Sequence, residues 1–169
     1  MAGRSPLGTA GLRADDVMIA ASDAAVVRET FKRLQPHLSH HALIMFLTMF
    51  DVSEEMRDLF WFVRDMDEPA PTNPVLQKHA NAAFKLICDS CCQLDDRAAV
   101  AGMLPAMQAL GGRHIKYNVR RPHLAVFRMA FLKTVAKALG SGWTEEVEGA
   151  WSRAYGRVEE MVMVGMGVR

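Results

Sequence analysis

Residues Leu110 to Val119 read LGGRHIKYNV, and the interpretation of the whole chain depends on the histidine within them, His114. It comes near the end of an apolar pattern with helical spacing, two glycines stand just before it, and a basic segment with a proline follows. Met107, Leu110 and Gly111 precede it at spacings of three and four, which predicts one shared helix face. Taken alone, His114 is either an ordinary residue at a helix end or a ligand. The rest of the chain has to decide between these interpretations.

Length and composition bound the class of protein. The chain has 169 residues, of which 50% are hydrophobic, so a single domain with a sizeable core is expected. A net charge of +1 gives no bulk electrostatic preference for nucleic acid or an anionic membrane. No apolar run is long enough for a transmembrane helix, and no signal peptide is visible. Three closely spaced cysteines, Cys88, Cys91 and Cys92, do not resemble a disulfide framework, so a reduced cytoplasmic setting is expected.

The order of helix signals predicts an all-α fold of seven to eight helices around one core. Weak periodicity over residues 1–20 predicts a mobile N-terminal extension, followed by a domain over residues 21–169. Pro36 should end the first helix, and Gly140 to Gly142 should end another. Helices are expected over residues 22–35, 39–50, 53–59, 75–94, 97–103, 105–114 and 123–139, and from 144 onward. The expected helix-capping residues are Ser39, Ser53, Asn73 and Thr144.

Two histidines lie on the inner stripes of separate predicted helices. His79 shares its stripe with Leu76, Ala83, Leu86 and Ile87, and it precedes His114 by 35 residues. Either histidine alone is more typical of a core hydrogen bond, whereas two that face each other make metal or haem binding competitive. A zinc ion would need further ligands, and none lies one helical turn from either histidine. Haem fits this pattern better, because its ring nitrogens leave only the axial positions for the protein.

At these residues the chain resembles the globin family, and within it the neuroglobin-like branch. Leu110 to His114 match the Leu-Gly-x-x-His pattern that contains the proximal histidine of globins. The distal histidine of the family aligns with His79 in LQKHA, and the phenylalanine that wedges against haem aligns with Phe60 in DLF. Phe46 falls at a pocket position of the second helix.

The resemblance covers residues 24–166, and AWSRAYG at 150–156 is similar to the ending of neuroglobins. It implies a globin fold over the predicted domain. The departures concern the detailed shape of the pocket: Glu54 replaces a frequent proline, Phe31 a tryptophan, Ala83 a valine, and Ala82 a basic residue.

The resemblance implies that haem b (iron protoporphyrin IX) is bound with His114 on the proximal side. His79 would either donate a hydrogen bond to a bound gas or bind the iron itself as a competing sixth ligand. The implied gas is oxygen, nitric oxide or carbon monoxide, and displacement of His79 would make the protein a poor carrier for bulk oxygen transport. The apolar pocket residues implied are Phe46, Phe60, Ala83, Met107, Leu110, Val119, Leu124 and Phe127.

Several interpretations remain open beside this one. The same haem could serve electron transfer, sensing, or nitric oxide and nitrite chemistry with a reductase as partner, whereas a haem-free helical interaction module would need both histidines to be structural. No nucleophile motif is present, so any enzymatic activity is expected to be a minor haem redox activity. The cysteines are either small core residues or a redox switch acting on the helix of His79. Lys78, Arg113 and Lys116 are either solvated or paired with haem propionates, and Gly111 and Gly112 should leave the porphyrin edge uncrowded.

Overall fold

A computed structural model describes residues 11–65 and 72–167, and within them it contains eight α-helices, three short 3-10 turns and no strand. This confirms the predicted all-α class. The α-helices are α1 (Ala21–Leu34), α2 (Leu38–Val52), α3 (Glu54–Asp58), α4 (Trp61–Arg64), α5 (Pro74–Cys91), α6 (Arg97–Lys116), α7 (Arg121–Leu139) and α8 (Glu145–Gly165). The 3-10 turns are η1 (Ala14–Asp16), η2 (Gln35–His37) and η3 (Gly140–Gly142).

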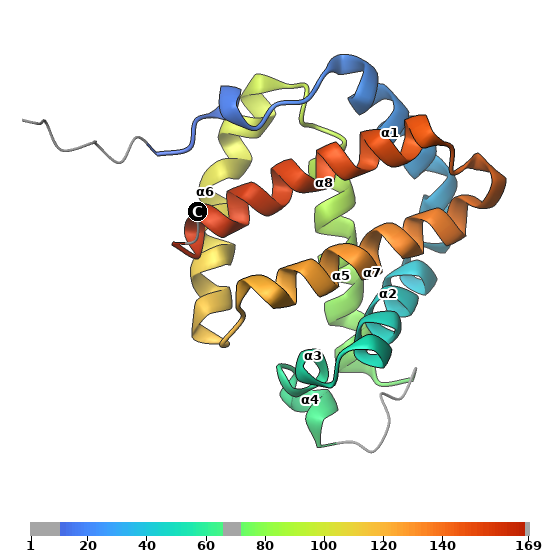
Figure 1. Ribbon diagram of the computed structural model, residues 1–169, viewed down its shortest axis with the longest axis vertical. Coiled ribbons are helices and arrows are strands. Elements are labelled where there is room, and N and C mark those ends of the chain that lie inside the picture. The colour runs from blue at the N-terminus through green and yellow to red at the C-terminus, as the bar shows by residue number, and fades with distance from the viewer. Residues whose placement is uncertain (1–10, 66–71, 168–169) are drawn as a thin grey trace, which may run out of the picture.

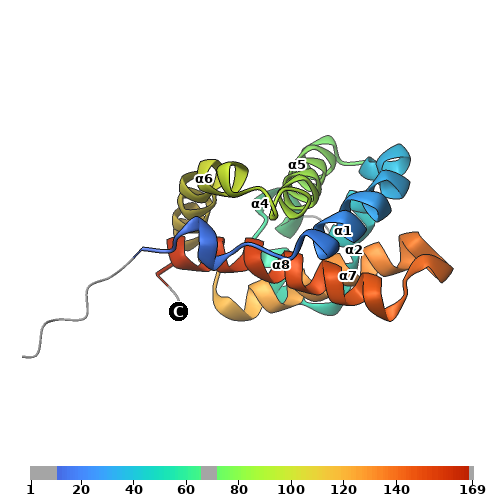
Figure 2. The ribbon, with the colours of Figure 1, turned by 90° about the horizontal axis from the view of Figure 1, so that it is seen from above.

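The helices form two crossed layers (Figures 1 and 2). Helices α5 and α6 lie in one layer, and α7 and α8 run across them in the other. Helix α6 packs mainly against α8, whereas α5 packs against both α2 and α8, and α2 also contacts α7. The two helices that carry the histidines, α5 and α6, therefore both pack against α8. No described helix is long and apolar enough to cross a membrane.

Three of the predicted helix caps are confirmed. The Ser53 hydroxyl accepts a hydrogen bond from the Met56 N–H at 3.3 Å, at the start of α3. Asn73 accepts from the Val75 N–H at 2.9 Å, and Thr144 accepts from the Val147 N–H at 3.3 Å. Each cap satisfies backbone donors that the first helical turn leaves unpaired.

Two predicted boundaries are wrong. Ser39 does not cap α2, because the turn η2 leads directly into a helix that begins at Leu38, and the Ser39 hydroxyl instead donates to Asn81 Oδ1 at 3.3 Å. Pro105 does not separate two helices, since α6 continues through it. Proline removes the hydrogen bond to the carbonyl four residues earlier, that of Ala101. Both residues are exposed, so water can solvate that carbonyl and the helix tolerates the loss.

The segment before α1 is packed rather than extended into solvent. Ala14 and Val17 belong to the core, and the Ile19 N–H donates to the Leu94 carbonyl at 3.1 Å. Arg97 at the start of α6 pairs with Asp15 at 2.8 Å. A single 3-10 turn thus packs residues 11–20 against the core without a periodic pattern, and the mobility expected over residues 1–20 stays a prediction. Residues 1–10 lie outside the described residues.

The core explains why one face of α5 is left for other contacts. Phe131 of α7 stacks with Phe84 of α5 and with Trp151 and Tyr155 of α8, at centroid distances of 5.1 to 5.8 Å. The face of α8 that carries Val147, Trp151, Tyr155, Val158 and Val162 is buried, and Trp151 Nε1 donates to the Thr30 hydroxyl at 2.9 Å. In α5 the buried stripe is Leu76, Ala80, Phe84, Cys88 and Cys91, whereas the predicted stripe through His79 and Ala83 is largely outside the core, and its Leu86 is exposed.

Candidate haem site

His114 lies in the last turn of α6 with its ring oriented by the backbone of its own helix. Its Nδ1 is 2.8 Å from the carbonyl oxygen of Leu110. A carbonyl only accepts hydrogen bonds, so Nδ1 carries the proton and Nε2 keeps a free lone pair. The backbone thus selects the tautomer in which Nε2 is able to bind a metal. The Val119 N–H donates to the His114 carbonyl at 3.0 Å, which fixes the turn after the helix.

His79 projects from α5 into a set of aromatic rings. Its centroid lies 5.4 Å from both Phe46 and Phe60, and 6.1 Å from Phe62. Burial among these rings, and then the nearby His114, lower the pKa of His79 below its usual range. The imidazole is therefore neutral at pH 7, although part of its surface remains exposed. A neutral imidazole is the form that acts as a metal ligand.

The apolar residues around the two histidines are incompletely covered. Phe46 is buried and touches the rings of Phe60 and Phe127 at 5.6 and 5.9 Å. Of the other predicted pocket residues, Met107 is buried, whereas six pack against the core and remain partly exposed: Phe60, Ala83, Leu110, Val119, Leu124 and Phe127. Phe62 shares that state and contacts His79, and the prediction missed it. For Phe62 the signal was present in the aromatic run Phe60 to Phe62.

These features match the requirements of haem better than those of a bare metal ion. Among the described residues no group of three or more His, Cys, Asp or Glu side chains could hold a metal ion. Haem brings its own equatorial nitrogens and a broad apolar surface, so it needs axial imidazoles and an apolar lining. The site offers two histidines from separate helices and partly exposed apolar side chains beside them.

A model of the globin family matches residues 44–162. This chain belongs to the globin family. It is 37% identical over 131 residues to an anaerobic nitrite reductase of Arabidopsis thaliana, covering 78% of this chain and 83% of the relative. It is 34% identical over 140 residues to one of Brassica napus, covering 83% and 87%.

Solved structures show the same fold. A neuroglobin of the acoel Symsagittifera roscoffensis superposes with a TM-score of 0.74 at 23% identity, covering 86% of this globin and 98% of that chain. A hexacoordinated haem protein of an anhydrobiotic tardigrade gives a TM-score of 0.75 at 17% identity, covering 88% and 96%. Family membership confirms the globin fold, haem binding and a diatomic gas as ligand. The individual ligating and lining residues stay predictions.

The cysteines of this globin fit the core interpretation. Cys88 and Cys91 are completely buried, and burial raises the pKa of both thiols. Burial, with Asp89 nearby, raises the pKa of Cys92 to about 11. Oxidation begins from the thiolate, which is therefore scarce at neutral pH. The three positions are poorly suited to the predicted redox switch.

The predicted role of Gly111 is wrong. A Cβ atom on Gly111 would lie 2.0 Å from the Val162 carbonyl oxygen, and one on Gly165 would lie 1.9 Å from the Gln108 carbonyl oxygen. These glycines therefore allow α6 and α8 to approach backbone to backbone, and Gly111 does not face the pocket. Gly165 is part of the same crossing as Gly111. Gly112 has one neighbouring atom within contact distance, at 3.8 Å.

Three basic residues flank the two histidines in the sequence. Lys78, Arg113 and Lys116 are exposed and form no ion pair within the described residues, so their contact with propionates stays a prediction.

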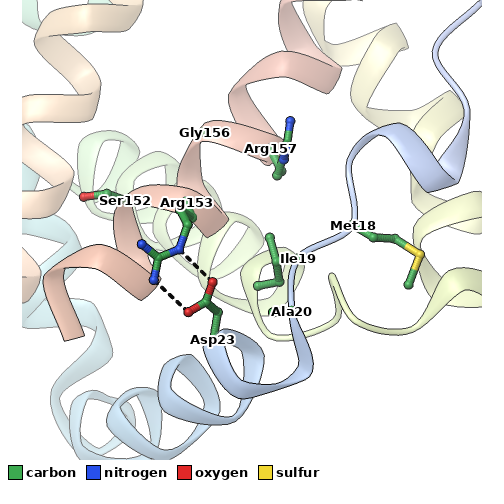
Figure 3. Close-up of a pocket in the computed structure, with 8 residues that line it drawn as sticks. All are labelled: Met18, Ile19, Ala20, Asp23, Ser152, Arg153, Gly156 and Arg157. Atoms are coloured by element: carbon green, nitrogen blue, oxygen red, sulfur yellow. Dashed lines mark hydrogen bonds and ion pairs between the residues drawn. The ribbon is translucent and has the colours of Figure 1, made fainter. Parts of the chain in front are cut away.

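A groove of about 470 Å³ lies between α8 and the segment that leads into α1 (Figure 3). Its two guanidinium groups are already paired, Arg153 with Asp23 at 2.7 Å and Arg157 with Glu160 at 3.0 Å. This groove is a junction between elements and is lined by neither of the two histidines.

Proposed function

We propose that this globin binds haem b between His114 and His79, and that His79 competes with a diatomic gas for the sixth coordination position. Haem supplies an iron that takes up a gas molecule and exchanges single electrons. The protein supplies the proximal imidazole, which the Leu110 carbonyl holds in the ligating tautomer. The apolar residues beside it exclude water and anions from the site.

The observation that carries the proposal is the placement of the two histidines. The His79 ring of α5 lies 5.4 Å from both Phe46 and Phe60, and the Leu110 carbonyl holds the His114 ring of α6 in the tautomer that leaves Nε2 to bind a metal. Burial, and then the nearby His114, lower the pKa of His79, which favours its ligating neutral form. A gas has to wait until His79 leaves, and its apparent affinity falls with the fraction of molecules in the open state. Such a protein suits sensing or redox chemistry better than bulk oxygen transport. The haem-free alternative loses support, because the chain belongs to a haem protein family.

Absorption spectra of the ferric, ferrous and carbon monoxide forms test this assignment. The wild-type ferrous protein without gas should show sharp, split visible bands, whereas His79→Leu should show one broad band. The matched control is His41→Leu, because His41 is also partly buried and also has a lowered pKa, but its ring contacts are His37 and His40. That control should keep the split bands. A broad band in the wild-type protein, or split bands in His79→Leu, contradicts the role given to His79.

Reduction of nitrite is a second candidate function, favoured by the relatives named anaerobic nitrite reductases. The reaction consumes one electron and two protons and converts nitrite into nitric oxide and water. An external one-electron donor, such as a reductase, has to restore the reduced protein.

Because three free cysteines lie among the described residues, we retain a cytoplasmic setting as part of this proposal.

Anaerobic mixing of the ferrous protein with nitrite tests this activity, with nitric oxide followed at an electrode. Nitrite needs the position that His79 occupies, so His79→Leu should release nitric oxide several-fold faster than wild type, by about tenfold if one molecule in ten is open. His41→Leu should match wild type. Equal rates in all three proteins would argue against His79 as a competitor, and no nitric oxide in any of them would argue against the activity.

A further inference from the structure

The aromatic rings that contact His79, Phe60 and Phe62, belong to the short segment formed by α3 and α4, which is weakly anchored. Helix α3 has five residues, and Met56 is the buried one among them. The chain then turns through Leu59 and Phe60 into α4. The rings of Phe60 and Phe62 both lie against His79. Burial of one apolar side chain thus attaches α3 only weakly to the rest of the fold.

Glu55 provides a second hold, on the start of α7. Its Oε1 lies 2.9 Å from Nε2 of His123, and it also accepts a hydrogen bond from the Arg120 guanidinium. His123 is buried with 2% of its surface exposed. Its Nδ1 accepts the Arg120 N–H at 3.0 Å, so the ring proton lies on Nε2 and faces the carboxylate. The Nε2 approach is close but poorly aligned for a hydrogen bond, so the charged partner of the carboxylate is the Arg120 guanidinium and His123 contributes by its close packing.

The environment of Glu55 shows that the carboxylate form is the one held. His123 first, and Arg120 to a smaller extent, hold the pKa of Glu55 below its usual range against the opposing effect of burial. Exposed ion pairs usually contribute little, because water competes for both partners. Here one partner is a buried imidazole that cannot move away, and this makes the contact a fixed anchor point.

The anchor point also lies beside the proximal histidine. Arg120 and His123 follow directly after Val119, whose N–H bonds to the His114 carbonyl. The corner between α6 and α7 therefore holds the proximal ligand on one side and receives Glu55 from the distal wall on the other. A displacement of α3 moves Phe60 and Phe62 relative to both histidines.

We infer that Glu55 is a positioning residue that holds α3 and α4 against the start of α7, so that Phe60 and Phe62 retain His79 in place. The inference rests on the proposed function, in which His79 must leave before a gas binds. Loss of the anchor frees the two rings, and His79 then leaves more readily. Glu55 itself touches neither the iron nor the gas.

Rapid mixing of the ferrous protein with saturating carbon monoxide measures how fast His79 leaves. Glu55→Ala should raise the limiting rate by roughly three- to tenfold, the effect of losing a partly exposed contact to a charged group. The matched control is Glu54→Ala, which removes the same charge from the adjacent position of α3, where no ion pair is formed within the described residues. Its rate should equal that of wild type. Glu55→Gln keeps an oxygen at the same place but removes the charge that pairs with Arg120, so its rate should lie between those of wild type and Glu55→Ala.

The outcomes separate this inference from the proposed function. A wild-type protein without split ferrous bands overturns the function and the inference together. Split bands with an unchanged or slower rate in Glu55→Ala overturn the role of Glu55 and leave the function intact. If Glu55→Ala does not fold, Arg120→Met removes one of the two partners and should still raise the rate by about twofold. A rate that rises equally in Glu54→Ala shows a general charge effect and also overturns the anchor.

Discussion

The two sides of the haem site are built on different physical principles. On the proximal side, α6 crosses α8 so closely that Gly111 and Gly165 have no room for a Cβ atom. On the distal side, His79 lies among aromatic rings of which Phe60 and Phe62 are only partly buried. The first contact joins backbone to backbone, whereas the second joins side chains that have space to turn.

This difference assigns rigidity and adjustment to opposite sides of the site. Backbone contacts leave no rotamer through which α6 can relax, so His114 is held by the fold itself. The distal rings stand on short helices, and Glu55 ties those helices to α7 through one carboxylate. Under the proposed function, this asymmetry would keep His114 fixed while His79 competes with a gas.

The largest effect is expected from breaking the proximal crossing. In Gly111→Ala the new Cβ meets the Val162 carbonyl oxygen at 2.0 Å, and a backbone atom cannot turn aside. The helices must separate, which should lower the free energy of unfolding by about 2–4 kcal/mol despite the better helix propensity of alanine. Urea unfolding of the haem-bound protein measures the change.

Gly112→Ala is the matched control for that prediction. Its Cβ would lie 3.8 Å from the nearest atom, an ordinary contact distance. The substitution should leave stability unchanged or raise it by up to about 1 kcal/mol, because alanine favours the helix. Similar losses in both variants would show that the crossing is no tighter than the rest of α6.

The contrast also explains what the sequence could and could not predict. The caps Ser53, Asn73 and Thr144 were predictable, because each acts on backbone donors two or three residues away. The two histidines stood out as a pair, because two imidazoles on the inner stripes of separate helices make haem binding competitive with a core hydrogen bond. Phe60 and Phe46 followed from the family resemblance, and the structure brings both to His79.

Features that depend on which helices meet could not be predicted. Gly111 was assigned to the porphyrin edge, since a sequence does not say which face of α6 meets α8. Pro105 was interpreted as a break between two helices. The sequence does not reveal that the Ala101 carbonyl, which loses its hydrogen bond, is exposed to water. The contact of Glu55 with His123 joins residues far apart in the chain, with no periodic signal between them. The inner stripe of α5 was misplaced because two of its faces are apolar.

The smallest effect on stability is expected from an ion pair at the N-terminal end of α6. This pair holds α6 in addition to its close crossing with α8. Arg28 of α1 binds Asp95, just before α6, through two hydrogen bonds of 2.7 and 3.1 Å. This pairing holds the pKa of Asp95 below its usual range, so the native state binds fewer protons there than the unfolded chain. The stabilisation is therefore complete above the ordinary aspartate pKa and is lost as the pH falls through the lowered value.

Asp95→Asn should accordingly cost about 0.5–1 kcal/mol at pH 7, a value limited by the exposure of Arg28. Urea unfolding should give the same difference from wild type at pH 5 and 7, and a shrinking one below about pH 4. Asp89→Asn is the control, because it removes an exposed pair with Lys85 inside α5 and should cost less than Asp95→Asn. Neither variant should change the ferrous spectrum, since the crossing at Gly111 continues to hold His114. A spectral change in Asp95→Asn alone would show that the position of α6 depends on this ion pair as well as on the glycine crossing.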